Sequence, residues 1–334
     1  MSIPIIGEEE QADTGFKEIP IIDLANISNN DPAVQQALAA GIRDACVNVG
    51  FFYVRNHGIS EGTISATLEV AKEFFALPLE TKMKLENHKT PNFKGYSPLL
   101  SGNNNPDNAG DLQEGFEFGW EPIDPLTARD DEDSETMSGA NVWPLELPEL
   151  RRKALKYYHA AVNLGKSLFP LFALALNLPS TFFDDKTQNS AALMKLLHYP
   201  PQTGAFDERV IGIGAHTDWE CFTILWQEPN IQALQVLNSE KQWVSAPPIP
   251  GTLVINLGDQ FARWTNDIFK STVHRAVNRS GVHRYSIPLF FGTDYNVRLE
   301  PVPGCVSPKR PARYEVTTAG EYVKGRLQAT YSHK

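Results

Sequence analysis

Residues 212–227, GIGAHTDWECFTILWQ, decide the fold and contain the first sign of a functional site. Residues 211–216 and 222–227 are two short apolar runs of the kind that form β-strands. His216 and Asp218 stand two positions apart, so on an extended backbone their side chains project from the same face. Both side chains can therefore reach one metal ion.

The region around this stretch has the pattern of an antiparallel barrel or sandwich. Short apolar or alternating segments recur at intervals of about ten residues, separated by Gly, Pro, Asn and Asp. They predict strands at residues 193–199, 211–216, 222–227, 232–237, 252–256, 271–277 and 284–291. The predicted fold is mainly β with flanking helices, and a jelly roll over residues 190–305 is the architecture that suits it.

The N-terminal region, residues 1–120, alternates strand and helix. Residues 19–27 and 51–58 are β-branched or aromatic runs that predict strands. A helix is expected between them, with Asp31 as its N-cap, Pro32 at its first position and Gly50 at its end. Apolar residues at helical spacing predict a second helix over residues 64–77 and a long helix from Pro148 to Leu178 that backs the sheet.

The 334 residues are expected to form a single catalytic domain. Its parts are the N-terminal region 1–120, a polar loop 121–147, the backing helix 148–180, the jelly-roll core 190–305 and a C-terminal segment 306–334. Residues 87–143 are rich in turn formers and charge and predict loops. Such loops form lids over binding sites or plain surface insertions, and the sequence favours neither.

Composition restricts the class of partner. A formal net charge of −10 argues against nucleic acid and anionic membranes, so a small molecule is the expected partner. The three cysteines, Cys46, Cys221 and Cys305, are widely and irregularly spaced, which suits a reducing compartment. With neither a signal-like N-terminus nor a bilayer-spanning stretch, the expected location is the cytoplasm. The oligomeric state stays open.

A third metal ligand is expected at His274, 58 residues after His216 and on another predicted strand. Two imidazoles and one carboxylate form the facial arrangement of non-haem iron(II) oxygenases, which leaves adjacent positions open for other ligands. Zinc hydrolases also use two His and a carboxylate. An HxD pair alone is weak evidence, because it also occurs at ordinary strand ends.

The segment after His274 supports a site for an anion. Arg284 and Ser286 alternate on one predicted strand face, so a guanidinium and a hydroxyl point the same way. A buried arginine needs an anionic partner, and 2-oxoglutarate that chelates the metal would present its far carboxylate there. Tyr199 could add a phenolic hydrogen bond. Taken singly, these residues are more often a surface salt bridge, a plain strand residue and a core aromatic.

The ordered motifs resemble the isopenicillin N synthase-like family of 2-oxoglutarate and iron(II)-dependent dioxygenases, over nearly the whole chain. The matching stretches are IPIIDL, VGFFYVRNHGI, FFALPLETKMK, GYSP, HTD, LQV, NLGD, STVHR and RYS. The resemblance implies a double-stranded β-helix, iron ligands at His216, Asp218 and His274, and 2-oxoglutarate contacts at Arg284, Ser286 and Tyr199. Leu197 stands where many plant members carry Asn.

The resemblance also implies the reaction. With dioxygen, 2-oxoglutarate is decarboxylated to succinate, and a C–H bond of a small molecule is oxidised, most often by hydroxylation and otherwise by desaturation or ring rearrangement. An amino acid, an aromatic or nucleobase methyl group and a secondary metabolite are all suitable substrates.

The substrate wall is expected next to the ligands, from Phe222 and Phe290 above all, and from Tyr96 and Trp219. Trp219 should point away from the ligand face unless the strand bends there. Ordinary barrel core is the alternative role of these aromatics. Three polar residues in or near the loops could meet a charged substrate: Lys94, Asn103 and Glu117.

Three other functions are compatible with parts of the pattern. An iron(II) oxidase of the same fold without 2-oxoglutarate would keep the RxS motif, and formation of succinate separates it from a dioxygenase. A non-enzymatic small-molecule binding protein has no need of three converging metal donors. A zinc hydrolase would leave Arg284 and Ser286 without a role.

Overall fold

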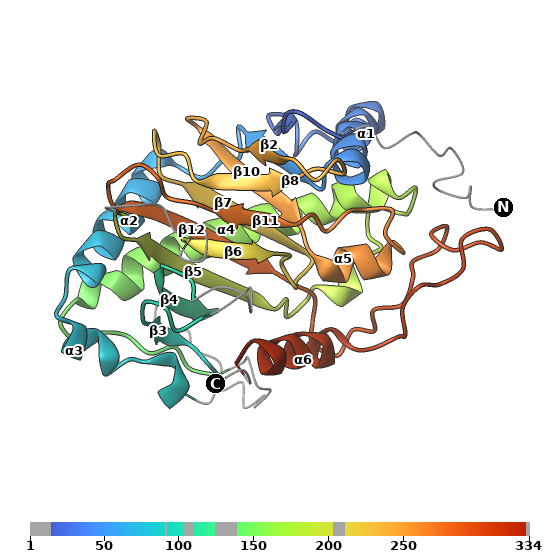
Figure 1. Ribbon diagram of the computed structural model, residues 1–334. Coiled ribbons are helices and arrows are strands. Elements are labelled where there is room, and N and C mark those ends of the chain that lie inside the picture. Colours follow the sequence, from blue (N-terminus) through green and yellow to red (C-terminus); the bar gives the residue numbers. More distant parts are fainter. Residues whose placement is uncertain (1–14, 91, 103–109, 124–138, 203–210, 332–334) are drawn as a thin grey trace.

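The computed structural model describes residues 15–90, 92–102, 110–123, 139–202 and 211–331 and contains two facing β-sheets with the longest helices on one side (Figure 1). The large sheet has the order β1-β2-β10-β7-β12-β5-β4-β3, and the small sheet has the order β6-β11-β8-β9. Apart from the parallel pair β1–β2, all neighbouring strands are antiparallel. This is the predicted jelly roll, a double-stranded β-helix.

The large sheet supplies most of the barrel. Its strands, in chain order, are β1 (Ile21–Asp23), β2 (Phe51–Arg55), β3 (Gly95–Ser97), β4 (Glu114–Gly119), β5 (Ala192–Tyr199), β7 (Phe222–Gln227), β10 (Thr252–Leu257) and β12 (Arg284–Phe291). The small sheet consists of β6 (Ile213–His216), β8 (Leu234–Leu237), β9 (Trp243–Ser245) and β11 (His274–Ala276). Each of the seven strands predicted from residue 193 onward coincides with or overlaps one of these strands.

Strands β3 and β4 lie within residues 87–143, where only loops were expected, and that prediction was wrong there. β4 has the sequence EGFEFG, in which Phe116 and Phe118 are the only apolar side chains. Two phenylalanines among glycines and glutamates are too weak an alternation to distinguish a strand from a loop. Pairing with β5 on one side and β3 on the other stabilises this strand.

The three predicted helices are present, with the expected start signals. They are α1 (Pro32–Asn48), α2 (Glu61–Phe75) and α4 (Pro148–Ala175). The Asp31 side chain accepts a hydrogen bond from the Ala33 amide at 2.8 Å, and Ser60 accepts one from the Thr63 amide at 3.2 Å. The described residues also form shorter helices: α3 (Leu79–Met83), α5 (Asp259–Trp264), α6 (Ala319–Tyr331) and the 3-10 helices Asn87–Lys89 and Asp184–Lys186.

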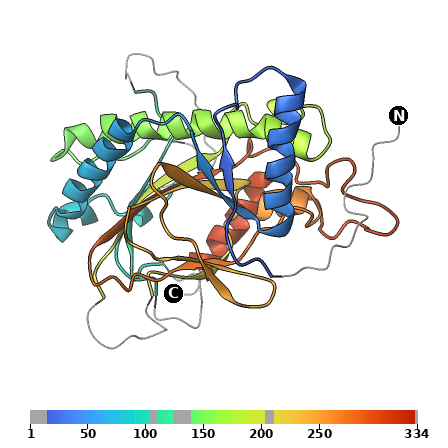
Figure 2. The same cartoon turned by 90° about the horizontal axis from the view of Figure 1, so that it is seen from above.

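Helix α4 covers the large sheet on the side away from the small sheet (Figure 2). At Gly165 a Cβ atom would lie 2.6 Å from the ring of Phe291, so the glycine allows the helix to approach β12 closely. Within the described residues, no helix combines the length and the apolarity needed to cross a bilayer.

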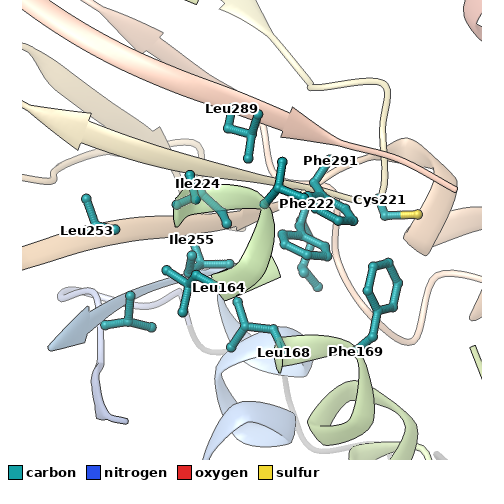
Figure 3. Close-up of a cluster of buried hydrophobic side chains, with 14 of the residues drawn as sticks. Leu164, Leu168, Phe169, Cys221, Phe222, Ile224, Leu253, Ile255, Leu289 and Phe291 are labelled. Atoms are coloured by element: carbon teal, nitrogen blue, oxygen red, sulfur yellow. The ribbon is translucent and has the colours of Figure 1, made fainter. Parts of the chain in front are cut away.

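The main core lies between α4 and the large sheet, and it determines which strand residues face the barrel interior. Figure 3 shows side chains of β7, β10 and β12 packed against Leu164, Leu168 and Phe169 of α4. The sheet residues in this cluster are Phe222, Ile224, Leu253, Ile255, Leu289 and Phe291. Because side chains alternate along a strand, the residues between them face the small sheet.

Candidate functional site

Three potential metal ligands converge at one end of the barrel. His216 is the last residue of β6, and it pairs directly with His274, the first residue of β11. Asp218 follows in the connection to β7. Its Oδ1 lies 3.6 Å from Nε2 of His216 and 3.7 Å from Nε2 of His274. All three ligand atoms lie within 4.8 Å of one another, so a single ion can contact each of them.

The surrounding hydrogen bonds orient these three groups for metal binding. Nδ1 of His216 lies 2.7 Å from the Gly214 carbonyl oxygen, and Nδ1 of His274 lies 3.1 Å from the Thr272 carbonyl oxygen. A carbonyl only accepts, so each Nδ1 carries the proton and each Nε2 keeps its lone pair for a metal.

Asp218 is held by its second carboxylate oxygen. Oδ2 accepts hydrogen bonds from the Thr223 hydroxyl at 2.5 Å and from the Asn256 side-chain amide at 2.7 Å, which leaves Oδ1 turned toward the two histidines. Thr223 and Asn256 are paired across β7 and β10. They were not identified from the sequence. The available signals were the position of Thr223 on the strand after the HTD motif and the position of Asn256 at the start of the NLGD motif.

Electrostatics favour the metal-binding forms of two ligands. Burial opposes ionisation of Asp218, but His274, His216 and Thr223 outweigh it and hold the pKa of this carboxyl well below its usual range. Burial and the neighbouring His216 lower the pKa of His274 to about 4. Burial also disfavours the charged form of His216, yet the contact with Asp218 raises its pKa overall. At neutral pH Asp218 is ionised and His274 is neutral, as ligation requires.

Arg284, the first residue of β12, is a buried cation on the inner face of the large sheet, and most of its hydrogen-bonding capacity is unused. Its side chain is only 1% exposed, and it pairs across the sheet with Tyr199, whose ring centre is 4.7 Å from the guanidinium carbon. Nη2 makes a long bond, 3.5 Å, to the side-chain oxygen of Gln227. Within the described residues Nε and Nη1 have no partner.

Ser286 is also buried and lies two positions further along the same face of β12. Next to both residues, Leu197 and Tyr199 pack against residues of the small sheet. A buried guanidinium with two unpartnered nitrogens is costly unless an anion enters, and a carboxylate matches its planar pair of donors. The donors of Arg284 and Ser286 therefore fit the far carboxylate of 2-oxoglutarate. Leu197 lies in the wall beside these two residues.

Two of the four aromatics expected in the substrate wall lie elsewhere. Phe222 is fully buried between the large sheet and α4, with its ring stacked on Phe291 at 5.3 Å between centres (Figure 3). Thr223, one residue later, takes the inward position. Tyr96 is 1% exposed and also lies on the helical side, where its hydroxyl donates to Glu114 at 2.6 Å.

The positions of the other two aromatics are compatible with a place in the substrate wall. Phe290 is half-buried on the inner face of β12 and pairs with Thr223, the residue that holds Asp218. Trp219 is half-buried beyond a bend in the chain after Asp218, and the Arg326 guanidinium of α6 lies 5.6 Å from the centre of its ring.

The three polar residues expected to meet a charged substrate also differ in where the structure places them. Lys94 is buried and donates to the Gly139 carbonyl oxygen at 2.7 Å. Glu117 forms an ion pair with Lys195 on the inner face of β4 and β5. Asn103 lies outside the described residues. Lys195 was not singled out from the sequence, although it stands at even spacing before Tyr199 and alternation alone directs it inward.

Comparisons with known proteins agree with this geometry. Residues 19–146 match the family described as non-haem dioxygenase in morphine synthesis N-terminal, and residues 190–293 match the 2OG-Fe(II) oxygenase superfamily. The chain is 35% identical over 319 residues to the 2-oxoglutarate-Fe(II) type oxidoreductase hxnY of Emericella nidulans, covering 93% of this chain and 90% of that protein. It is 32% identical over 320 residues to the homoarginine-6-hydroxylase 2-ODD-233 of Oryza sativa subsp. japonica, covering 92% and 96%.

Solved structures lead to the same family. A full-length Neurospora crassa protein, solved in complex with alpha-KG (2-oxoglutarate) and thymine, superposes with a TM-score of 0.81 at 27% identity and covers 93% of this chain and 96% of that one. A Caulobacter crescentus protein whose structure is described as that of a 2OG-Fe(II) oxygenase family protein superposes with a TM-score of 0.81 at 29% identity, covering 94% and 99%. This chain therefore belongs to the 2OG-Fe(II) oxygenase superfamily and is a dioxygenase that uses Fe(II), 2-oxoglutarate and O2 to hydroxylate a small molecule.

Proposed function

We propose that iron(II) is held by Nε2 of His216, Nε2 of His274 and Oδ1 of Asp218. We assign the far carboxylate of 2-oxoglutarate to Arg284, with Ser286 and Tyr199 beside it. The observation that carries this assignment is the pair of unpartnered nitrogens on the buried Arg284 guanidinium, on the inner face of the large sheet in a barrel that also holds the three converging ligands. We also propose that the whole chain forms a single catalytic domain, and we expect it to act in the cytoplasm.

The chain's own residues have three tasks in this reaction. Iron and 2-oxoglutarate, when bound, supply the oxidation, in which 2-oxoglutarate and O2 become succinate and carbon dioxide and one oxygen atom enters a substrate C–H bond. His216, Asp218 and His274 orient the metal, and Thr223 and Asn256 keep the carboxylate turned toward it. Arg284 binds the carboxylate of 2-oxoglutarate that lies farther from the metal. Phe290, next to Thr223 on the inner face, is the aromatic residue that we place against the substrate.

The oxidase without 2-oxoglutarate is less well supported. The curated relatives are named for 2-oxoglutarate, and the Neurospora crassa structure contains it. Without that co-substrate, the buried Arg284 would need another anion of the same shape. The same argument applies to a zinc hydrolase. A purely binding protein would not need the hydrogen bonds that orient three metal donors.

The test is formation of succinate by the purified protein with iron(II), 2-oxoglutarate and O2. We expect a slow rate that a true substrate accelerates. His216→Ala should abolish succinate formation. Arg298→Met, which alters an exposed pair with Glu300 outside the barrel, serves as the control and should not change it. Unchanged succinate formation in His216→Ala would contradict the assignment of iron.

A further inference from the structure

A row of hydrogen-bonded polar side chains lies on the helical side of the large sheet, behind Arg284. Its centre is His198 of β5, which is 8% exposed and lies 5.4 Å from the ring of Phe75 of α2. Nδ1 of His198 lies 2.7 Å from a carboxylate oxygen of Glu114 on β4, and Nε2 lies 2.7 Å from Nδ1 of His283. The proposed function gives this row no task.

The pairing of β5 with β12 connects the row to the co-substrate anchor. Arg284 pairs with Tyr199, and the next pair in this register is Tyr285 with His198. Two ring partners of His198 are therefore the chain neighbours of Arg284. One is Tyr285, whose ring stacks on that of His198 at 4.8 Å between centres, and the other is His283, reached through the hydrogen bond. A single side chain thus contacts the residues on both sides of the anchor.

Arg284 itself makes few contacts that could fix its position. Its guanidinium lies 4.7 Å from the centre of the Tyr199 ring and makes one hydrogen bond of 3.5 Å to Gln227. Within the described residues, two of its nitrogens have no partner. Arg284 is also the first residue of β12 and follows the exposed segment 279–283. The position of the guanidinium therefore depends on how firmly the backbone at the start of β12 is held.

Glu114 fixes the orientation of the His198 ring. Its other carboxylate oxygen accepts hydrogen bonds from the Lys82 ammonium at 2.7 Å and from the Tyr96 hydroxyl at 2.6 Å. Burial opposes ionisation of Glu114, but the hydrogen bonds from these groups outweigh it and lower the pKa of the carboxyl. An ionised carboxylate only accepts, so Nδ1 of His198 carries a proton. In a neutral ring Nε2 is then the acceptor, and Nδ1 of His283 donates to it.

Stability alone is a poor explanation of this row. Lys82 and Glu114 form a buried ion pair, and desolvation offsets most of the attraction in such a pair. An apolar ring in place of His198 would pack against Phe75 equally well. A fully hydrogen-bonded buried network does hold one particular geometry, because each member is fixed by its partners. That property suits a row that lies directly behind a binding residue.

We propose that His198 is a positioning residue for the binding of 2-oxoglutarate. Held by Glu114 and hydrogen-bonded to His283, it keeps the start of β12 where the Arg284 guanidinium meets the far carboxylate of the co-substrate. His198 acts through Arg284, because its own ring lies on the opposite face of the sheet. This inference rests on the proposed function, since it takes Arg284 to bind 2-oxoglutarate.

The experiment measures binding of 2-oxoglutarate to the full-length anaerobic protein loaded with iron(II). The visible charge-transfer band of the chelate is titrated with 2-oxoglutarate, and iron(II) affinity and the thermal unfolding midpoint are measured beside it. The variants are His283→Phe, His198→Phe, Arg284→Met and the double variant His283→Phe/Arg284→Met. His283 is exposed, so its replacement leaves the core intact. His159→Phe is the control, at a half-buried histidine of α4 that contacts the Glu121 carbonyl oxygen.

We expect His283→Phe to raise the dissociation constant of 2-oxoglutarate roughly 3- to 10-fold, the net value of one hydrogen bond. His198→Phe should raise it at least as much, because the bond to Glu114 is lost as well. Iron(II) affinity should match wild type in both. In the Arg284→Met background, His283→Phe should change the dissociation constant by less than about twofold, because the residue through which it acts is gone. His159→Phe should bind 2-oxoglutarate as wild type does.

Three results would overturn the inference. One is an unchanged dissociation constant of 2-oxoglutarate in both His283→Phe and His198→Phe. A second is an equal effect of His283→Phe with and without Arg284, which shows that the row does not act through the anchor. The third is a parallel fall in iron(II) affinity and in unfolding midpoint, which assigns the row to stability. The proposed function fails separately, if Arg284→Met alone binds 2-oxoglutarate as tightly as wild type.

Discussion

Substitution of Arg284 by Met should make the protein more stable and less active at the same time. The guanidinium is buried, and two of its nitrogens have no partner within the described residues. Each unpartnered buried donor costs about 1–3 kcal/mol. Methionine removes that cost but also removes the contact with the Tyr199 ring, worth about 1–2 kcal/mol, and the long bond to Gln227. Two such donors cost about 2–6 kcal/mol together, so after these losses the expected net change is a gain of up to roughly 4 kcal/mol in free energy of unfolding without 2-oxoglutarate.

The same substitution should abolish the stabilisation by 2-oxoglutarate. A ligand present at a hundred times its Kd stabilises the folded state by about 2.7 kcal/mol, and wild type should show a gain of this order. Loss of one partner of a buried charge pair costs about 3–5 kcal/mol, which lowers the affinity of Arg284→Met for 2-oxoglutarate at least roughly 100-fold.

Urea unfolding under anaerobic conditions, with iron(II) and with or without 2-oxoglutarate, measures both effects. Arg298→Met, at an exposed arginine, is the matched control and should behave as wild type. The reasoning is refuted if Arg284→Met loses several kcal/mol of stability without 2-oxoglutarate and still gains as much from the ligand as wild type does. Arg284 would then be a structural residue whose charge is already compensated.

Other predictions concern the core, the metal site and one buried lysine. Phe222→Ala should lower the free energy of unfolding by about 3–5 kcal/mol in urea denaturation, whereas Phe290→Ala should cost less and instead reduce the ratio of product to succinate. Asn256→Ala should weaken iron(II) binding roughly 10- to 100-fold in a metal titration, because Asp218 loses a donor that orients it, and unchanged affinity would contradict that role. Lys94 has its folded pKa lowered from 10.5 to about 8, so between these values the unfolded chain binds more protons and stability rises with pH. Lys94→Met should therefore be more stable than wild type at pH 7 by up to about 3 kcal/mol and lose that advantage toward pH 10.5, and urea curves that differ equally at both pH values would contradict this.

The residues at the metal end and at the co-substrate end were predictable because their spacing has a direct geometric meaning. His216 and Asp218 are two positions apart, as are Arg284 and Ser286, so short-range alternation was enough to orient each pair. The link between His216 and His274 was less direct, since a separation of 58 residues has no geometric meaning by itself. It rested on the place of His274 on another predicted strand of the same barrel, and the resemblance to a known family supported it. The strands around them were also predictable, because their apolar runs are bounded by turn formers.

The predictions from sequence were wrong where the chain bends or where glycine weakens the alternation of a strand. The bend after Asp218 changes the alternation, so that Thr223 and not Phe222 faces the ligands. Glu117 was noticed only as a loop residue, because the strand that orients it contains glycine at 115 and 119. Its partner Lys195 lies 78 positions away on β5, and only the register between β4 and β5 brings the two together.

The most direct test of the central claim is the visible spectrum of the anaerobic protein with iron(II) and 2-oxoglutarate. If His216, Asp218 and His274 hold the iron and Arg284 anchors the co-substrate, wild type should develop the weak charge-transfer band of the iron–2-oxoglutarate chelate. His274→Ala should show no band at the same concentrations. A band of equal intensity in His274→Ala, or none in iron-loaded wild type at saturating 2-oxoglutarate, would contradict the account.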